Sequence, residues 1–519
     1  MSESDAIVPP ETAMVRKRRR RTRMALITVA VVLVTAGVWG AVTVFRTCGS
    51  LGSGVQEIDG DCVGVTDGTY AFHPDLADIQ ARIAAENARV REHPNGYVSV
   101  ALLDPLTPTG HSALPPSAVR NRLEGAYTAL RRINRYRVAG DPNPQIQLLL
   151  ANQGSSDDQW RHVLTRLREL SEAEPPLLGV IGLGVSTART KQQAEDLSGL
   201  GIPMVAAVLT ADDFEYDHIP GLIKTSPSNR HYVAALRDYL GSTALDSAIM
   251  VRDSNSDLGS DLYTRTLEEQ FATQMGDYIK FETQQFTGVS GSGDEPPSLF
   301  DNVQANICAA ADEEGVAILY AGREIDLGDL LESLENRTCT NAPLTVLTAG
   351  LELGEVLKDI DLRAAKLTIL NAATVDPAGW NRGEEGTPTY YEDFRLAYVN
   401  EERFSPRHLR DGGAIMMHDA LLTAARAIRL AAPEGSASQL TPKIVRTQLL
   451  NINTGYEVRG ASGTLRFSKL PARGGTGIPK GKPIPVIQYP HPTDEELPSQ
   501  RVGRLCVITT GPGILRCGA

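Results

Sequence analysis

The 519-residue chain has little of the chemistry that marks the common enzyme and nucleic-acid-binding classes. Aromatic residues make up 5% of it and are not interleaved with basic residues, the pattern that binds nucleic acid. It lacks a Gly-Lys-Ser/Thr phosphate loop, a Gly-x-Ser-x-Gly nucleophile turn and a His-Glu-x-x-His helix, and its nine histidines are scattered. The sequence therefore favours a protein that is not an enzyme, and no cofactor is expected.

Cysteine is scarce as well, and its spacing excludes the usual metal sites. The six cysteines include no Cys-x-x-Cys pair, and no histidine lies at ligand spacing from any of them. The stretch Asp253 to Thr264 begins like a calcium loop but lacks the Gly and the final Glu, so no metal is expected. In an oxidising compartment, the grouping of the cysteines along the chain predicts disulfides between neighbours. The predicted pairs are Cys48–Cys62, Cys308–Cys339 and Cys506–Cys517.

A net positive charge is found at the N-terminus, whereas the rest of the chain is acidic. The formal net charge is −12, and the first 23 residues hold seven basic and three acidic side chains, so the remaining residues carry −16. Nucleic-acid binding depends on neutralising phosphates with Lys and Arg. No nucleic-acid partner is therefore expected.

A basic block and an uncharged run dominate the N-terminus. Arg16-Lys-Arg-Arg-Arg-Arg-Thr-Arg23 precedes the run from Met24 to Phe45, which carries no charged residue. About 20 apolar residues span a bilayer, and basic flanks stay on the cytoplasmic side. We expect a cytoplasmic tail over residues 1–23, one transmembrane helix over 24–45, and a single-pass protein of the cell membrane with its bulk outside.

Two alternatives exist for this segment. A cleaved signal peptide has a similar pattern, but its apolar part is usually shorter, and no small-x-small cleavage site precedes Arg46. A lipid anchor on Cys48 would need small and aliphatic residues where Arg46 and Thr47 stand. The uncleaved anchor is the favoured interpretation.

From Tyr97 onward, short apolar runs alternate with amphipathic helical segments, which is typical of parallel α/β structure. The segment Ala118 to Asn134, for example, has apolar residues at helical spacing and arginines on the opposite face. A chain of this length exceeds one hydrophobic core, so two or more lobes are expected. The predicted strands are residues 98–103, 146–150, 177–181, 204–208, 248–251, 278–282, 316–320, 344–348 and 367–370.

The stretch Gly182-Leu-Gly-Val-Ser-Thr187 follows an apolar strand and opens a helix. It resembles the start of a dinucleotide fingerprint, but Thr187 stands where the third glycine belongs. What remains is a helix N-terminus whose amides and the hydroxyls of Ser186 and Thr187 suit a small anion. Alternatively, Ser186 only caps its own helix. Thr210 follows the next strand and adds a hydroxyl at the same sheet edge, where ligands of α/β sheets bind.

Several short motifs follow one another in a characteristic order over about residues 97–488. They are Val180-Ile-Gly, Ser186, Gly201-Ile-Pro-Met-Val, Thr210, Ile223-Lys-Thr-Ser-Pro-Ser-Asn229, Asp253-Ser-Asn-Ser-Asp-Leu-Gly259, Leu319-Tyr-Ala-Gly-Arg323, His418-Asp-Ala420 and Gly460-Ala-Ser-Gly-Thr-Leu-Arg-Phe467. In this order they resemble the branched-chain amino-acid-binding family of type I periplasmic binding proteins. The resemblance implies an α/β fold of two doubly wound parallel-sheet lobes, joined by three crossover strands and closing around a ligand.

The resemblance also implies a binding site. Ser186, Thr187 and the segment from Val208 to Thr210 would bind the ligand's carboxylate from lobe one, and Leu258, Arg323 and Gly350 would contribute from lobe two. Leu258 stands where the family usually has an aromatic residue. Arg323 either pairs with a second ligand carboxylate or braces Glu324 or Asp326 on the surface.

These expectations give a domain plan and a function. Residues 46–94 are expected as a juxtamembrane segment, 95–224 and 373–466 as lobe one, 225–372 and 467–490 as lobe two, and 491–519 as a C-terminal extension. The expected function is capture of a small amino-acid-like ligand for an ABC-type transporter permease. The alternatives are a ligand-sensing ectodomain that acts through a signalling partner, and a structural or interaction module that binds no ligand.

Overall fold

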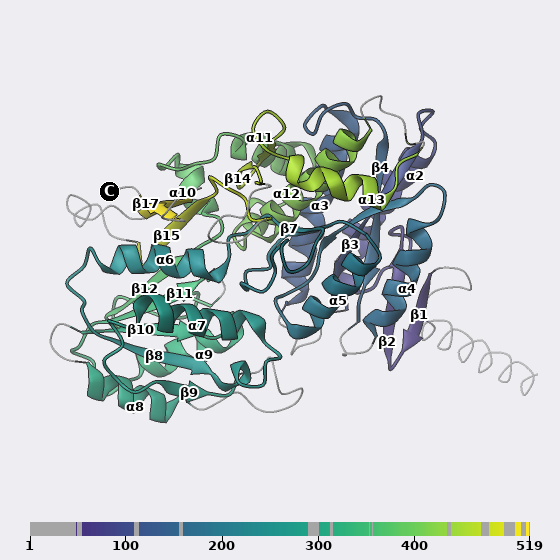
Figure 1. Ribbon diagram of the computed structural model, residues 1–519. Coiled ribbons are helices and arrows are strands. Elements are labelled where there is room, and N and C mark those ends of the chain that lie inside the picture. The colour runs from purple at the N-terminus through teal and green to yellow at the C-terminus, as the bar shows by residue number, and fades with distance from the viewer. Residues whose placement is uncertain are drawn as a thin grey trace, which may run out of the picture.

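The chain folds into two α/β lobes that lie next to each other (Figure 1). The structure is a computed structural model and describes residues 48, 54–107, 114–154, 159–288, 300–311, 315–351, 353–354, 356–432, 437, 439–468, 477–491, 504–509 and 515–517. The predicted tail and transmembrane run, residues 1–45, lie outside the described residues. Within the described part, no helix combines the length and the apolar character needed to cross a membrane.

Lobe one is built on a seven-stranded sheet with the order β1-β2-β4-β3-β5-β6-β7. The strands from β4 to β7 are parallel, whereas β1 and β2 join the edge in antiparallel fashion. Every residue of β4 and β5 is buried, as expected for strands covered on both faces. The strands are β1 Val55–Ile58, β2 Asp61–Thr66, β3 Tyr97–Asp104, β4 Gln145–Asn152, β5 Leu177–Gly182, β6 Met204–Ala206 and β7 Leu222–Lys224.

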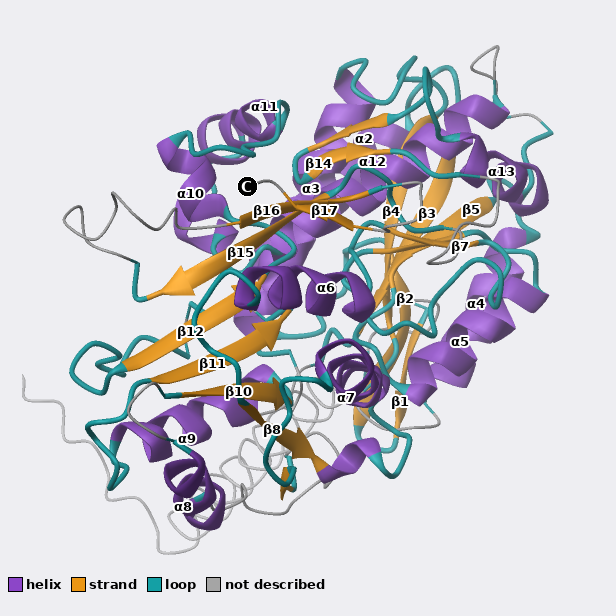
Figure 2. Cartoon of the chain, turned by 60° about the vertical axis from the view of Figure 1, so that its left-hand side comes forward, coloured by secondary structure: helices purple, strands orange, loops and turns teal. Residues whose placement is uncertain are grey.

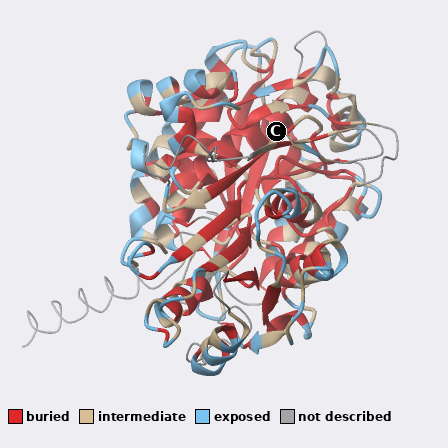
Figure 3. Ribbon diagram, turned by 90° about the vertical axis from the view of Figure 1, so that its left-hand side faces the viewer, coloured by how far each residue is buried: buried red, intermediate tan, exposed pale blue. Residues whose placement is uncertain are grey.

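Helices cover both faces of this sheet. Alternate residues of β3 divide between two cores: Val100 and Leu102 pack with α2, α3 and α12, while Ala101 and Leu103 pack with α4 and α5. Figure 3 shows the buried strands between partly exposed helices. The helices are α2 Ala77–Arg91, α3 Pro116–Arg135, α4 Trp160–Ser171, α5 Ala188–Gly199, α10 Pro377–Arg382, α11 Tyr391–Leu396, α12 Gly413–Ala431 and α13 Pro442–Gln448. A small hairpin of β13 Val458–Gly460 and β14 Gly463–Leu465 follows them.

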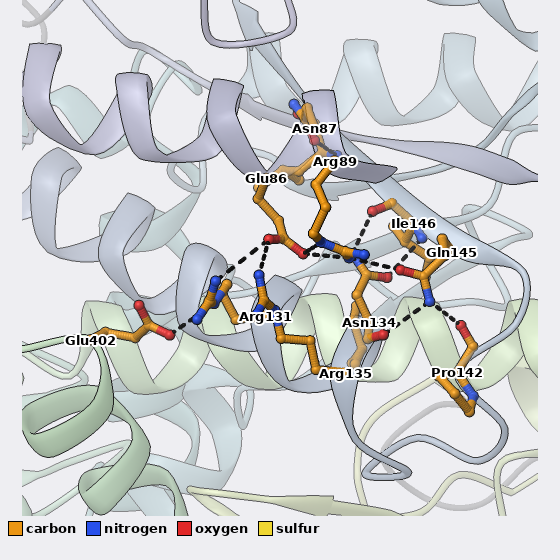
Figure 4. Close-up of polar contacts among 12 residues, drawn as sticks. Glu86, Asn87, Arg89, Arg131, Asn134, Arg135, Pro142, Gln145, Ile146 and Glu402 are labelled. Atoms are coloured by element: carbon orange, nitrogen blue, oxygen red, sulfur yellow. Dashed lines mark hydrogen bonds and ion pairs between the residues drawn. The ribbon is translucent and has the colours of Figure 1, made fainter. Parts of the chain in front are cut away.

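Residues 54–94, which the sequence set apart as a juxtamembrane segment, are part of lobe one. Their strands β1 and β2 extend its sheet, and α2 packs against β4 and α3. Asn87 of α2 bonds both main-chain groups of Leu148, and Glu86 binds three arginines of α2 and α3 (Figure 4). The segment belongs to lobe one because β2 pairs with β4 and α2 covers β4 and α3, so these surfaces are not exposed to solvent.

Lobe two is built on an eight-stranded sheet with the order β17-β16-β15-β12-β11-β10-β8-β9. Helices α6 and α7 lie on one face and α8 and α9 on the other (Figure 2). Residues 278–282, predicted as a strand, form only an isolated bridge at Ile279, and β9 forms farther along. The elements are α6 Asn229–Leu240, β8 Ala248–Asp253, α7 Leu262–Met275, β9 Gln284–Phe286, α8 Asp301–Ala310, β10 Val316–Ala321, α9 Glu324–Glu335, β11 Leu344–Ala349, β12 Leu367–Ala372, β15 Pro483–Tyr489, β16 Arg504–Ile508 and β17 Leu515–Cys517.

The predicted C-terminal extension also joins a lobe. Strands β16 and β17 continue the antiparallel edge that β15 begins, and Cys506 is buried in the core under α6. The three predicted disulfides are confirmed: Cys48–Cys62, Cys308–Cys339 and Cys506–Cys517. The terminal pair therefore fastens the last two strands of the sheet.

The chain crosses between the lobes three times, after β7, after β12 and before β15. The crossings lie against one another: Lys224 N donates to Gly477 O at 2.8 Å, and Ala373 N donates to Pro485 O at 2.8 Å. The α/β class and the parallel-rich sheets predicted from the sequence are confirmed.

Candidate functional site

The glycine turn after β5 is held by a buried carboxylate of the neighbouring strand. Gly182, Leu183 and Gly184 all have positive φ, and a Cβ on Gly182 would lie 3.0 Å from Asp104 Oδ1. Asp104, at the end of β3, accepts from Gly184 N at 2.7 Å and pairs with Arg122 at 3.3 Å. Burial raises the pKa of Asp104 even though Arg122 opposes the shift. The glycine turn therefore holds the carboxylate of Asp104, a side chain of the protein itself.

Ser186 joins the ends of two strands. Its Oγ accepts from Thr210 N at 3.1 Å and from Ala211 N at 3.3 Å, so the structure brings Ser186 and Thr210 together at one sheet edge. Thr187, and not Ser186, is the N-cap of α5, because its side chain accepts from Thr190 N. Ser186 therefore does not cap its own helix, and its hydroxyl fixes the loop that carries Thr210.

The main chain beside Ser186 contacts lobe two directly. Ser186 O accepts from Leu262 N at 3.1 Å and from Tyr263 N at 3.2 Å, and Ala188 N donates to Ser260 O at 2.9 Å. These three bonds close the lobes against each other at this edge of the cleft.

Arg323 stabilises the lobe-two side of the same contact. Its guanidinium binds both carboxylate oxygens of Asp261, the N-cap of α7, and lies 3.4 Å from Ser186 O. The side chains of Arg323 and Asp261 are 12% and 4% exposed. Burial lowers the pKa of Arg323, but the Asp261 charge outweighs it, so the pKa lies above its ordinary value. Arg323 thus pairs with Asp261, a partner that neither sequence interpretation named.

Leu258 is not brought to the other predicted residues. It lies in the turn after β8 and is 74% exposed, and its neighbour Asp257 pairs with Arg252. Glycine at 259 completes that turn with a φ of +66°. The family position that an aromatic residue usually fills therefore lies at the surface here.

Val208, Thr210 and Gly350 line a cavity of about 330 Å³ between the lobes. Val208 and Thr210 come from the carboxyl edge of the lobe-one sheet, whereas Gly350 follows β11 of lobe two. A Cβ on Gly350 would lie 3.7 Å from Thr210 Cγ2, so the two lobes approach closely here. The crossover residues Ala373 to Asp376 form part of the wall.

Charged side chains that the sequence did not single out also line this cavity: Arg382, Arg410, Asp376 and Asp411. Asp411 accepts from Asn121 Nδ2 at 2.5 Å and from Gly413 N at 2.9 Å, and burial raises its pKa to about 6. Burial also raises the pKa of Asp376, which caps α10 through Gly379 N. The available signals were Asp-Pro at 376–377, typical of a helix start, and Asp-Gly-Gly at 411–413, typical of a turn.

The described residues offer no metal site to this cavity. The one group of His, Cys, Asp or Glu at metal spacing in the described part is Asp238 with Cys506 and Cys517. Those cysteines form a disulfide, so they cannot act as thiolate ligands.

Comparisons with known proteins identify the fold. No protein-family profile matches the chain, and no curated sequence matches it. A leucine complex of an ABC transporter substrate-binding protein from Desulfitobacterium hafniense matches with a TM-score of 0.51 and 13% identity, covering 81% of this chain and all of that one. A leucine-binding protein from Thermotoga maritima matches with a TM-score of 0.53 and 15% identity, covering 81% of this chain and 98% of that one.

A third solved structure agrees with these two. The branched-chain amino acid transporter substrate-binding protein from Streptococcus pneumoniae, in complex with isoleucine, has a TM-score of 0.52 and 14% identity, and the match covers 75% of this chain and 95% of that one. The first and third are substrate-binding proteins of transporters, the second is a leucine-binding protein, and none of the three is described as an enzyme. The chain therefore has the fold of the type I periplasmic binding proteins.

Proposed function

We propose that this protein is a solute-binding protein that captures a small, amino-acid-like ligand between its lobes and presents it to an ABC-type transporter. The observation that carries the proposal is the cavity at the carboxyl edges of both sheets, whose wall is shared by the two lobes and a crossover. Ligands of open α/β sheets bind at such edges. A volume of about 330 Å³ lies in the range of small-molecule sites.

The lining favours a ligand that carries both charges. Arg382 and Arg410 can bind a carboxylate, and Asp376 and Asp411 can bind an ammonium group. Val208, Met416 and Ile487 supply apolar wall for a short side chain. The three solved structures include leucine and isoleucine complexes, which supports an amino-acid-like ligand, while the four charged residues favour one more polar than leucine.

A membrane tether completes the proposal. The uncharged run at 24–45, preceded by the basic block, would hold the binding lobes outside the cell membrane beside a permease. The alternative within this proposal is that the tethered protein reports bound ligand to a signalling partner.

One observation favours a second candidate, an interaction module that binds no ligand. The main chain of Ser186 and the side chain of Arg323 already bind groups of lobe two. In this candidate function the closed lobes form a fixed surface, and the cavity beside the crossovers has no functional ligand.

A thermal-shift screen of the full chain against amino acids, dicarboxylates and small aromatic acids tests the proposal. A ligand at 100 times its Kd adds about 2.7 kcal/mol to the free energy of unfolding. We expect Arg410→Gln to abolish the shift. Arg407→Gln is the matched control, because Arg407 is equally exposed, lies three residues away and does not line the cavity.

The outcomes separate the candidates. A shift that disappears only in Arg410→Gln supports the binding protein, and loss of uptake in cells with this variant assigns it to transport. An altered association with a partner on adding ligand, without an uptake defect, assigns it to sensing. No shift across the panel contradicts ligand capture and favours the interaction module.

A further inference from the structure

Lobe one carries a second cavity that shares no lining residue with the one between the lobes. It measures about 420 Å³ and lies where the end of α3, the start of α11, the middle of α12 and the approach to β13 meet. Four arginines line it: Arg132, Arg137, Arg426 and Arg459.

These arginines are not neutralised by carboxylates. Among the described residues, none of the four has a carboxylate oxygen within 4.0 Å in an ion pair. Most other arginines of the lobe are paired: Arg131 contacts Glu86 and Glu402. Asp393 and Asp419 act on Arg132, and Glu457 acts on Arg426, without direct ion pairs, so the guanidinium groups can still bind an external anion.

Two of the arginines are held in place through neutral acceptors. Arg132 Nη1 donates to His418 Nε2 at 2.9 Å, and the other ring nitrogen of His418 lies 2.8 Å from Asp419 Oδ1. Arg426 Nε donates to Tyr456 O at 3.1 Å. Bonds to neutral groups position a guanidinium without cancelling its charge.

Two of the lining guanidinium groups stack on aromatic rings, which orient them. Arg459 lies over the ring of Tyr390 at 5.3 Å, and Arg426 lies over the ring of Tyr456 at 5.7 Å. A guanidinium stacked on a ring keeps its N–H edge free for planar, bidentate recognition of an oxyanion.

The acidic residues of the cavity do not balance this charge. Asp393 and Glu457 also line it, which leaves an excess of two positive charges in a protein of net charge −12. Glu457 accepts from Gly455 N at 2.5 Å, and bonds to main-chain amides hold its pKa below its ordinary value. Glu457 is thus engaged with its own loop.

A fifth arginine, Arg429, lies beside this cavity and lines a neighbouring one of about 440 Å³. Arg429 follows Arg426 by three residues on α12, is 6% exposed, and donates Nη2 to Ile133 O at 2.6 Å. Its Nε and Nη1 have no hydrogen-bond partner among the described residues. A Cβ on Gly140, a lining residue, would lie 3.2 Å from Arg426 Nη1 and 3.9 Å from Arg429 Cδ. Asp141 already supplies a negative charge that acts on Arg429, so the anion site depends on the four lining arginines.

We propose that this cavity is a binding site for a phosphate-class oxyanion that carries two or more negative charges. Several guanidinium groups directed at one cavity fit phosphoryl oxygens, which accept bidentate bonds and need more than one positive charge. A free phosphorylated compound and the headgroup of an anionic lipid share this chemistry. The site is independent of the proposed amino-acid-like ligand.

Calorimetric titration of the full chain with inorganic pyrophosphate tests the proposal. We expect saturable binding that becomes at least about tenfold weaker in the double variant Arg137→Gln/Arg459→Gln, because each lost charge-assisted contact costs on the order of tenfold. Both residues are exposed, so the fold should survive. The matched control is Arg403→Gln/Arg407→Gln, which removes the same charge from exposed positions outside the cavity.

The source of the anion follows from a second titration. Dihexanoyl phosphatidic acid is compared with dihexanoyl phosphatidylcholine in the same variants. Variant-sensitive binding of pyrophosphate alone supports a free phosphorylated ligand, and variant-sensitive binding of the acidic lipid alone supports a headgroup. Absence of binding by both probes, or equal affinity in the cavity variant and the wild type, overturns the proposal. Loss of amino-acid binding by the Arg410→Gln variant leaves this site unchanged.

Discussion

Arg323 and Asp261 form a two-point ion pair where the lobes meet, and this pair fixes the start of α7. The amides of Leu262 and Tyr263 thereby face Ser186 O in lobe one. The contact uses main-chain groups at each lobe edge, and the ion pair behind it keeps them aligned.

The Asp261→Asn variant removes the negative charge of this pair and keeps the size of the side chain, so it tests the contribution of the charge alone. Asn also caps helices well, so α7 should begin at the same residue. Removing one partner of a buried pair leaves the other uncompensated, and we expect the free energy of unfolding to fall by about 3 kcal/mol. Urea unfolding measures the loss. A double-mutant cycle with Arg323→Gln should give a coupling energy above about 1 kcal/mol, and additive effects would contradict the pairing.

Gly350→Ala should weaken capture of the ligand. The new Cβ would lie 3.4 Å from Tyr232 Cε2 and 3.7 Å from Thr210 Cγ2, which narrows the cavity between the lobes. Its positive φ adds strain of about 1 kcal/mol. Gly259→Ala is the control, because it has a similar φ and no atom within 4 Å of its Cβ. We expect at least tenfold weaker ligand binding in the first variant only, by calorimetry; equal weakening in both would assign the effect to backbone strain.

Stability should rise between pH 8 and 10. Lys224 and Lys482 lie at the first and third crossovers, and burial lowers the pKa of each to about 8. In that range the unfolded chain binds more protons than the folded chain, so deprotonation favours the folded state as the pH rises. Below pH 8 the full cost of two buried ammonium groups is present.

Midpoints of urea unfolding, measured at steps of about half a pH unit, give the slope of stability against pH in this range. Lys482→Met should reduce it, while Lys358→Met, at an exposed position, should not. An unchanged slope in Lys482→Met would show that this lysine does not titrate in that range.

Removing the Cys308–Cys339 disulfide should cost more than removing Cys506–Cys517. The loops they close differ in sequence separation, 31 against 11 residues. Loop-closure entropy gives about 3 to 4 kcal/mol for the first and about 1 kcal/mol less for the second. Paired Cys→Ala variants and thermal unfolding provide the comparison. A larger loss for the short loop would show that the terminal strands hold more of the lobe-two core than the entropy of closure indicates.

In the Glu86→Gln variant, the free energy of unfolding should fall less steeply as the pH is lowered into the acid range. Burial raises the pKa of Glu86, but Arg89 and Arg135 outweigh it, so the pKa lies below its ordinary value. Its ion pairs therefore stabilise the fold above about pH 4.5 and are lost as the pH falls through the lowered pKa. At pH 7 we expect a loss of about 2 kcal/mol, since the arginines are partly exposed. Glu169→Gln, at a surface pair, should cost under about 1 kcal/mol.

The strands that the sequence predicted correctly are those buried on both faces. β5 and β10 are continuous apolar runs and β4 contains the apolar run Leu148 to Ala151, which residue type alone reveals. β1 and β2 were missed because they are short edge strands with Gly and charged residues, and the apolar Tyr278 to Phe281 misled because it packs beside β8 without forming a ladder.

Part of the lining of the cavity between the lobes could also be predicted from the sequence, because those residues follow strands. Thr210 and Gly350 stand at strand ends, where the order along the chain places them at a cleft. Arg382 ends α10, whereas Arg410 and Asp411 lie just before α12, and their meeting with lobe two depends on tertiary contacts. Arg323 was expected to pair with a ligand carboxylate or with Glu324 or Asp326, because the sequence does not disclose Asp261, 62 positions away, as its partner.

The Cys48–Cys62 bond has a mechanical consequence. It fastens residue 48 to β2, so any pull applied to the chain before that point reaches the edge of the lobe-one sheet and not the crossovers. With the proposed N-terminal tether, lobe one would be the half held at the membrane, and opening of the cleft would move lobe two relative to it. In that tethered arrangement, a transporter or partner that senses opening would detect it best by contacting lobe two.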